Sequence, residues 1–124
     1  NGIGNLTSRI MKMATTHLED GIHPDTTPFG EEYSQVLTAG DVKRALEYVC
    51  KEMSDLDLYI QTTEPFKVVK VDRDRAIILI NEMRIKLYNI ARLLDSFTPK
   101  TSARIKECVR DHVMPEKALF GRLA

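Results

Sequence analysis

Two polar residues near the start of the chain have side chains suited to hydrogen bonding with a ligand. Asn5 and Arg9 are four residues apart, so on a helix both side chains project from one face. An amide offers both a donor and an acceptor, and a guanidinium offers several donors. The alternative interpretation is structural: Asn5 caps the helix and Arg9 is an ordinary solvated charge.

Cysteine and histidine, the other residues that often carry chemistry, are few and scattered. Cys50 and Cys108 each occupy an apolar position of a helical pattern, and we interpret both as free core thiols of a reducing cytosol. His17 and His112 lie on two different expected helix faces, and His23 lies in an expected loop. This spacing predicts neither a disulfide nor a metal site.

Composition and charge exclude several classes of protein. The formal net charge is zero, so no global field draws the chain to nucleic acid or to an anionic membrane, and a nucleic-acid contact has to use a local basic face. The longest apolar run, Ala76 to Ile80, is too short to span a bilayer, and no secretory signal opens the chain. We expect a cytoplasmic domain, and the start at Asn1 indicates a piece of a longer protein.

The first part of the chain predicts one helix followed by a loop. The helix is expected from about Gly4 to Leu18, with Gly21 as its stop. Two prolines and two threonines indicate a loop over Asp20 to Gly30, and a short helical turn is expected at Glu31 to Leu37. Apolar positions of the first helix recur at spacings of three and four, at Ile3, Leu6, Ile10, Met13 and His17.

A second helix is expected over about Asp41 to Thr62. Asp41 is a suitable N-cap, and Pro65 is expected to end the helical region. The segment from Phe66 to Val71 alternates like a strand but is short and lies between helices, so we interpret it as a connector.

The third and fourth helices complete the predicted architecture. The third begins near Asp72 or Asp74, runs to about Ser96 and is apolar on more than one side, which is typical of a central helix. Thr98 as N-cap and Pro99 in the first turn open a fourth helix to about Val113. The sequence therefore predicts one all-α domain over 1–124, an antiparallel bundle of four to five helices.

Several motifs, in order along the chain, resemble one family. The segments are GNLTSR at 4–9, DLYI at 57–60 followed by EPFKVVK at 64–70, ARLLDSFTPKT at 91–101 and ALFGR at 118–122. Together they are similar to the anticodon-binding domain of methionyl-tRNA synthetases, which are class I aminoacyl-tRNA synthetases. The resemblance covers nearly the whole chain and is weakest between Asp20 and Gly40.

This resemblance implies a role in reading tRNA. Asn5 and Arg9 match the family's Asn and Arg that read the methionine anticodon CAU, and Phe66 stands where the family has Trp. An unpaired base presents an edge that fixed donors and acceptors recognise, and an aromatic ring supplies a stacking platform. The family thus implies methionine-specific tRNA and the synthetase's own catalytic domain as partners, with no DNA and no membrane.

The chain departs from the family pattern at two positions. Phe66 keeps a stacking face but lacks the N–H of indole, and its alternative role is a core aromatic that closes the bundle. Asp57 replaces an Asn and brings a negative charge toward the expected RNA-facing surface. Five basic residues are expected to flank this site, either as phosphate contacts or as ordinary solvated charges. They are Lys12, Lys67, Lys70, Arg73 and Arg75.

The sequence predicts no catalytic centre in this chain. The family's ATP-handling His-x-Gly-His and Lys-Met-Ser-Lys-Ser motifs are missing, as are a zinc knuckle and a glycine-rich phosphate loop. ATP and methionine are expected to bind a separate catalytic domain, and this domain is expected to need no cofactor. The competing hypothesis is a protein–protein docking bundle, derived from a synthetase, that has lost anticodon reading.

Overall fold

A computed structural model describes residues 2–19, 40–95 and 97–114 of the chain. The regular elements in these ranges are all helices, which confirms the predicted all-α bundle. They are α1 (Gly2–His17), α3 (Val42–Thr63), α4 (Pro65–Val71), α5 (Arg73–Leu94) and α6 (Pro99–Asp111).

The helix starts follow from their capping residues. Asp41 accepts a hydrogen bond from the backbone N–H of Arg44 at 3.0 Å, and Asp72 accepts one from that of Arg75 at 3.2 Å. Thr98 holds the N-cap position of α6 without a side-chain cap bond, and Pro99 follows it. The predicted boundaries of the long helices are therefore confirmed to within about two residues, apart from the end at Ser96, which lies outside the described residues.

The connector expected after Pro65 is wrong, because residues 65–71 form the short helix α4. Glu64 adopts a left-handed backbone conformation, with φ of 46°, and turns the chain sharply at the end of α3. Pro65 then starts a new helix, since its fixed φ suits a first helical position and its missing N–H is not needed there. Proline here ends one helix and begins the next.

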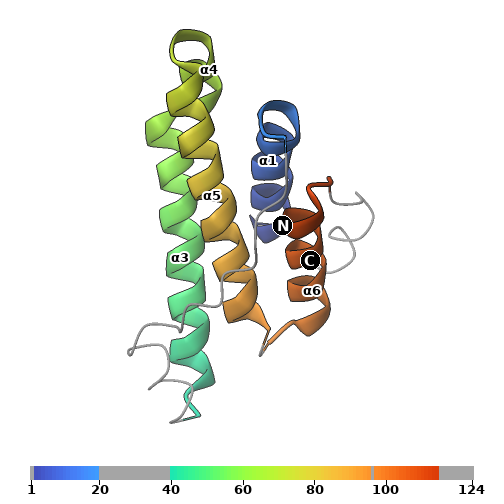
Figure 1. The fold of residues 1–124 in the computed structure, drawn as a ribbon. Coiled ribbons are helices and arrows are strands. Elements are labelled where there is room, and N and C mark those ends of the chain that lie inside the picture. Colours follow the sequence, from blue (N-terminus) through green and yellow to red (C-terminus); the bar gives the residue numbers. More distant parts are fainter. Residues whose placement is uncertain (1, 20–39, 96, 115–124) are drawn as a thin grey trace.

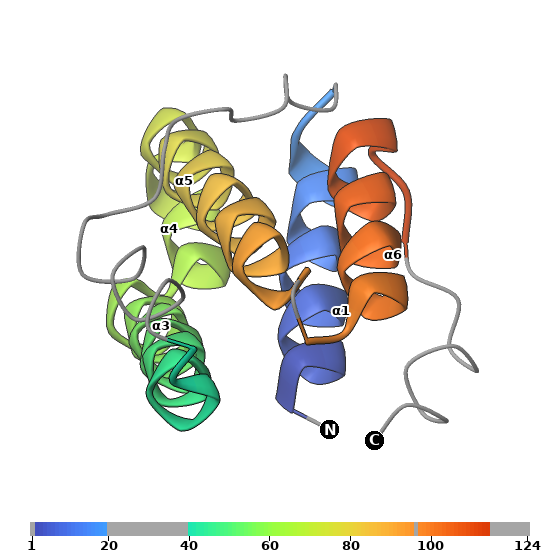
Figure 2. The same cartoon turned by 90° about the horizontal axis from the view of Figure 1, so that it is seen from below.

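The helices pack around α5. Figure 1 shows α3, α5 and α6 running in alternating directions, with α4 at the corner where α3 turns into α5. Seen along the bundle in Figure 2, α5 lies between α3 on one side and α1 with α6 on the other. Contacts of α5 with each of α1, α3, α4 and α6 confirm that it is the central helix.

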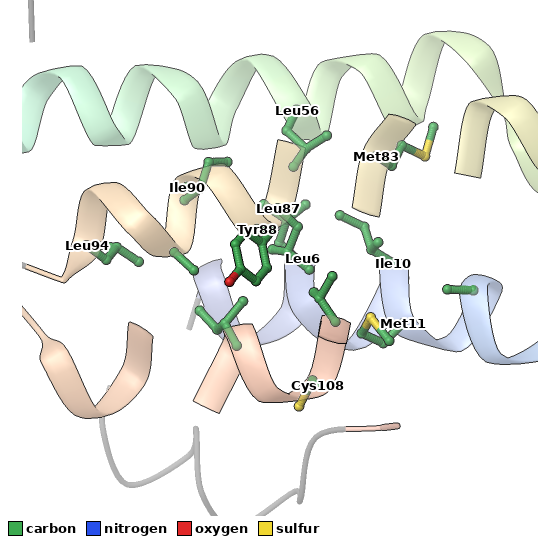
Figure 3. Packing of buried hydrophobic residues seen from close by; sticks show 14 of the residues in the cluster. Leu6, Ile10, Met11, Leu56, Met83, Leu87, Tyr88, Ile90, Leu94 and Cys108 are labelled. Carbon is green, nitrogen blue, oxygen red and sulfur yellow. The ribbon is translucent and has the colours of Figure 1, made fainter. Parts of the chain in front are cut away.

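The core is continuous across these helices (Figure 3). Leu6 and Ile10 of α1, Leu56 of α3 and the buried face of α5 belong to one cluster of buried apolar side chains. The predicted stripe of α1 is shifted, because Met11 is fully buried while Met13 is only partly so. Small polar residues fit the interface of α5 with α6, where the buried Ser102 hydroxyl donates to the carbonyl of Ala91.

The two cysteine thiols differ in their burial. Cys108 is buried in α6, as predicted, and burial raises its pKa to about 11. Cys50 is exposed, so its assignment to the core is wrong. It follows Val49, and α3 buries only a narrow face against α5, so the next residue along the helix already points outward.

Some expectations fall outside the described residues. They are the loop over 20–30, the helical turn over 31–37, His23 and the ALFGR segment near the end of the chain. Within the described ranges, no helix combines the length and the apolar character needed to cross a bilayer.

Candidate functional site

A hollow of about 310 Å³ opens between α1 and α3. Both helices pack on α5, and residues of both line the hollow. Its lining residues come from two turns of each helix: Asn5, Leu6, Arg9, Met53, Ser54 and Asp57. The structure thus brings the two polar residues singled out in the sequence to one concave surface.

Asn5 and Arg9 are positioned by the buried face of α1. Leu6 and Ile10, next to them in sequence, are almost completely buried, so Asn5 and Arg9 are held at the edge of the packed interface and remain exposed. Because α1 begins at Gly2, Asn5 lies inside the helix and is not its N-cap. The capping interpretation of Asn5 is therefore excluded by its position.

Arg9 forms an ion pair across the hollow. Its Nη1 donates to Oδ1 of Asp57 at 2.7 Å, and the two side chains are 47% and 40% exposed. The Nε2 of Gln61, one turn further along α3, donates to Oδ2 of the same carboxylate at 2.7 Å. Such an exposed pair contributes little to stability, about 1 kcal/mol or less, but it fixes the direction of both charged groups.

The residues predicted from the sequence to form the site line the α1 side of the hollow, whereas most residues on its α3 side were not predicted. On α3 the sequence indicated only Asp57, as an unusual negative charge, whereas Ser54 and Gln61 were not predicted site residues. The available signal was their spacing, because residues 53, 54, 57 and 61 fall on one face of a helix. Nothing in the sequence specified that this face lies opposite Asn5 and Arg9.

Phe66 lies away from the hollow. It is on α4 and is 53% exposed, so it is not a core aromatic that closes the bundle. It is not among the lining residues, and the last turns of α3 separate Asp57 from Glu64 by about 10 Å along the helix axis. The ring is accessible to a ligand that extends beyond the hollow toward α4.

The predicted basic residues are all on the surface. Lys12 is exposed one turn beyond Arg9 on α1, and Lys70 is exposed on α4. Lys67 pairs with Glu64 at 3.3 Å, so part of its charge is neutralised locally. Arg73 and Arg75 are exposed in the first turn of α5.

Tyr59 of the DLYI segment connects the α3 wall to α5. Its hydroxyl donates to Oε2 of Glu82 at 2.6 Å, and Nζ of Lys86 lies 5.8 Å from the centre of its ring. The hydrogen bond to Glu82, with a smaller contribution from burial, raises the pKa of Tyr59. Tyr59 therefore links α3 to α5 two residues beyond Asp57.

A second polar cluster ties the far end of α1 to α5 and α6. The buried Arg84 donates to Oδ1 of Asn81 at 2.7 Å and contacts Nδ1 of His112 at 3.3 Å. Nε2 of His112 lies 2.9 Å from the carbonyl oxygen of Leu18. A guanidinium can only donate, so Nδ1 accepts from Arg84 and Nε2–H donates to Leu18.

In the part of the chain that the structure describes, no group of three or more His, Cys, Asp or Glu side chains is placed to hold a metal ion. His17 and His112 lie near the same end of α1, where His112 uses both ring nitrogens in the contacts above.

Comparison with known proteins agrees with the motifs. The chain is 29% identical to methionine–tRNA ligase 1 of Alkaliphilus oremlandii over 73% of its own length. It is 28% identical to the methionine–tRNA ligase of Rhizobium meliloti over 88%, and 24% identical to that of Aeropyrum pernix over 83%. No family model matches the chain, and no solved structure matches it.

These matches cover 17%, 24% and 20% of the respective ligases, so the chain spans about a fifth of their length. The resemblance stated from the motifs is confirmed by these three relatives from three organisms. Over most of its length, this helical chain is similar to one part of methionine–tRNA ligases.

Proposed function

We propose that this chain is a tRNA-binding module that recognises the methionine anticodon CAU. The observation that carries the proposal is the hollow between α1 and α3, where Asn5 and Arg9 of the GNLTSR segment line one concave surface. Its supporting context is the similarity to methionine–tRNA ligases over most of the chain.

The hollow suits one unpaired base. Its volume of about 310 Å³ is at the lower end of the range for small-ligand pockets, roughly 300–1,000 Å³. Leu6 and Met53 supply apolar walls for the faces of a base, and Asn5 and Arg9 supply hydrogen-bonding groups for its edge. The first anticodon base, cytosine, is the one we assign to this hollow.

Phe66 and the lysines extend the interface beyond the first base. The half-exposed ring on α4 offers a stacking surface worth roughly 1–3 kcal/mol per base. Lys12, Lys67 and Lys70 neutralise neighbouring phosphates, so binding should weaken steeply as salt concentration rises. The chemistry of a methionine–tRNA ligase then belongs to a separate catalytic domain that binds ATP and methionine.

The proposal is tested by titrating the chain with a fluorescent anticodon stem–loop carrying CAU. A matched loop changed only at the first anticodon base is expected to bind roughly 10-fold more weakly. Asn5→Ala and Arg9→Ala should remove this preference, whereas Arg104→Ala, which deletes an exposed arginine on α6, should keep it. Equal affinity of the unmodified chain for the two loops, up to the highest concentrations, would contradict anticodon reading.

A second candidate function is docking to another protein. It is favoured by exposed apolar side chains on α3, where Val42 and Leu46 lie one turn apart and are 58% and 41% exposed. In this case Val42→Ser with Leu46→Ser should abolish partner binding, while Asn5→Ala and Arg9→Ala should leave it unchanged.

A further inference from the structure

The Arg9–Asp57 pair presents donors and an acceptor side by side to the hollow. Arg9 uses one Nη1 hydrogen on Asp57 at 2.7 Å, and a guanidinium has five N–H groups in all. Asp57 accepts this bond on Oδ1, and each carboxylate oxygen has capacity for about two bonds. Since both side chains line the hollow and are 40–47% exposed, their remaining capacity is accessible to a ligand.

The carboxylate is held in a fixed orientation before any ligand binds. Gln61 donates from Nε2 to Oδ2 at 2.7 Å from the same helix, while Arg9 holds Oδ1 from the opposite wall. Both oxygens are therefore engaged, and rotation of the group breaks two hydrogen bonds. A group ordered in this way loses little conformational freedom on binding.

Asp57 differs chemically from the other polar groups around the hollow. The amide of Asn5 and the hydroxyl of Ser54 can each donate or accept, so each adapts to either kind of ligand atom. Among the six lining residues, the carboxylate of Asp57 is the single charged group that can only accept. It is therefore the group best able to reject a ligand that places an acceptor opposite it.

We propose that Asp57 determines specificity for cytosine over uracil at this site, an inference that rests on the proposed anticodon reading. Arg9 donates to the O2 and N3 acceptors of cytosine, and Asp57 accepts from its exocyclic amino group. The donor–donor–acceptor edge of the pair thus complements the acceptor–acceptor–donor edge of cytosine. Uracil places its O4 carbonyl against the carboxylate, where two acceptors face each other without a proton.

The experiment uses three anticodon stem–loops that differ at the first anticodon position. They carry cytosine, uracil or 2-pyrimidinone, which is cytosine without its amino group. The chain is expected to bind the cytosine loop roughly 10-fold or more tightly than the other two. Asp57→Ala should bind the cytosine and 2-pyrimidinone loops equally, because the partner of the amino group is gone.

Two further variants control for charge and folding. Asp55→Ala removes the same charge two residues away on the exposed side of α3 and should keep the full preference for cytosine. Asp57→Asn preserves shape but can donate to the uracil O4, so its preference for cytosine over uracil should fall. Thermal unfolding followed by circular dichroism verifies that each variant is folded.

The outcomes separate this inference from the function on which it rests. Absence of any cytosine preference in the unmodified chain would overturn the proposed function and this inference with it. A cytosine preference that persists in both Asp57 variants would overturn only the role of Asp57. Equal weakening of all three loops by Asp57→Ala would assign Asp57 to the positioning of Arg9 and would also overturn its role in specificity.

Discussion

Two arginines on different sides of the same bundle illustrate two uses of one side chain. Arg9 lies at the edge of the hollow between α1 and α3, with its side chain 47% exposed and paired to Asp57. Arg84 lies on α5, is only 4% exposed, and contacts Asn81 and His112. Both are held by hydrogen bonds, but only Arg9 has a largely exposed side chain.

The difference in burial sets what each arginine contributes. An exposed ion pair is screened by water, so its removal costs the fold little, and the remaining hydrogen-bonding capacity of its two groups is accessible to a ligand. A buried guanidinium has lost its hydration and depends on protein partners, so deleting it or its partners leaves polar groups unsatisfied. We expect Arg84 to stabilise the junction of α1, α5 and α6, and Arg9 to serve binding.

The largest effect is expected for Arg84→Ala. The change removes a buried side chain and leaves the side-chain oxygen of Asn81 without this donor, so we expect a loss of about 3 kcal/mol in the free energy of unfolding. Denaturant titration of the variant beside Arg104→Ala, an exposed arginine on α6, measures the difference. If both variants lose the same small amount, Arg84 does not hold the helices together.

A smaller effect is expected for His112→Ala. The variant loses the bond to the Leu18 carbonyl and the acceptor for Arg84, and we expect it to be about 1–2 kcal/mol less stable. His17→Ala, at the partly exposed end of α1, is the matched histidine control, and we expect it to lose less stability than His112→Ala. Hydrogen exchange of the last turn of α1 should accelerate in His112→Ala, which locates the loss at this contact.

The smallest effect on stability is expected for Arg9→Ala. Its exposed ion pair predicts a loss below about 1 kcal/mol, even though the same variant should lose its preference for the CAU loop. Thermal unfolding and the stem–loop titration are measured on one preparation. If Arg9→Ala loses as much stability as Arg84→Ala, the two arginines do not differ in their contribution to the fold, and Arg9 has a structural role.

Much of the fold was predictable because it depends on local patterns. Apolar spacing of three and four residues and the capping side chains Asp41 and Asp72 are properties of short segments, and they located the long helices. Residues 65–71 were misjudged because seven residues carry too little periodicity to tell a helix from a connector, and Pro65 is compatible with both. Cys50 was misassigned because the width of the buried face of α3 depends on its neighbours.

The candidate site was predictable on one wall only. Asn5 and Arg9 share a face by helix geometry alone, so their proximity needs no tertiary information. Phe66 is on α4 and does not line the hollow, while Asp57 contacts Arg9 directly across 48 positions of sequence. A contact between residues so far apart in sequence depends on how α1 and α3 both pack on α5, which no local pattern encodes.

The four long helices, the capping residues Asp41 and Asp72 and the central position of α5 were predictable from the amino-acid order, because side-chain periodicity and backbone preferences act within a few residues. The sequence also carried the motifs that resemble methionyl-tRNA synthetases. The packing of the helices places Asp57 opposite Arg9, leaves Phe66 exposed on a separate short helix, and buries Arg84 where three helices meet. These outcomes depend on packing between distant segments, where burial and pairing determine what each charged group can do.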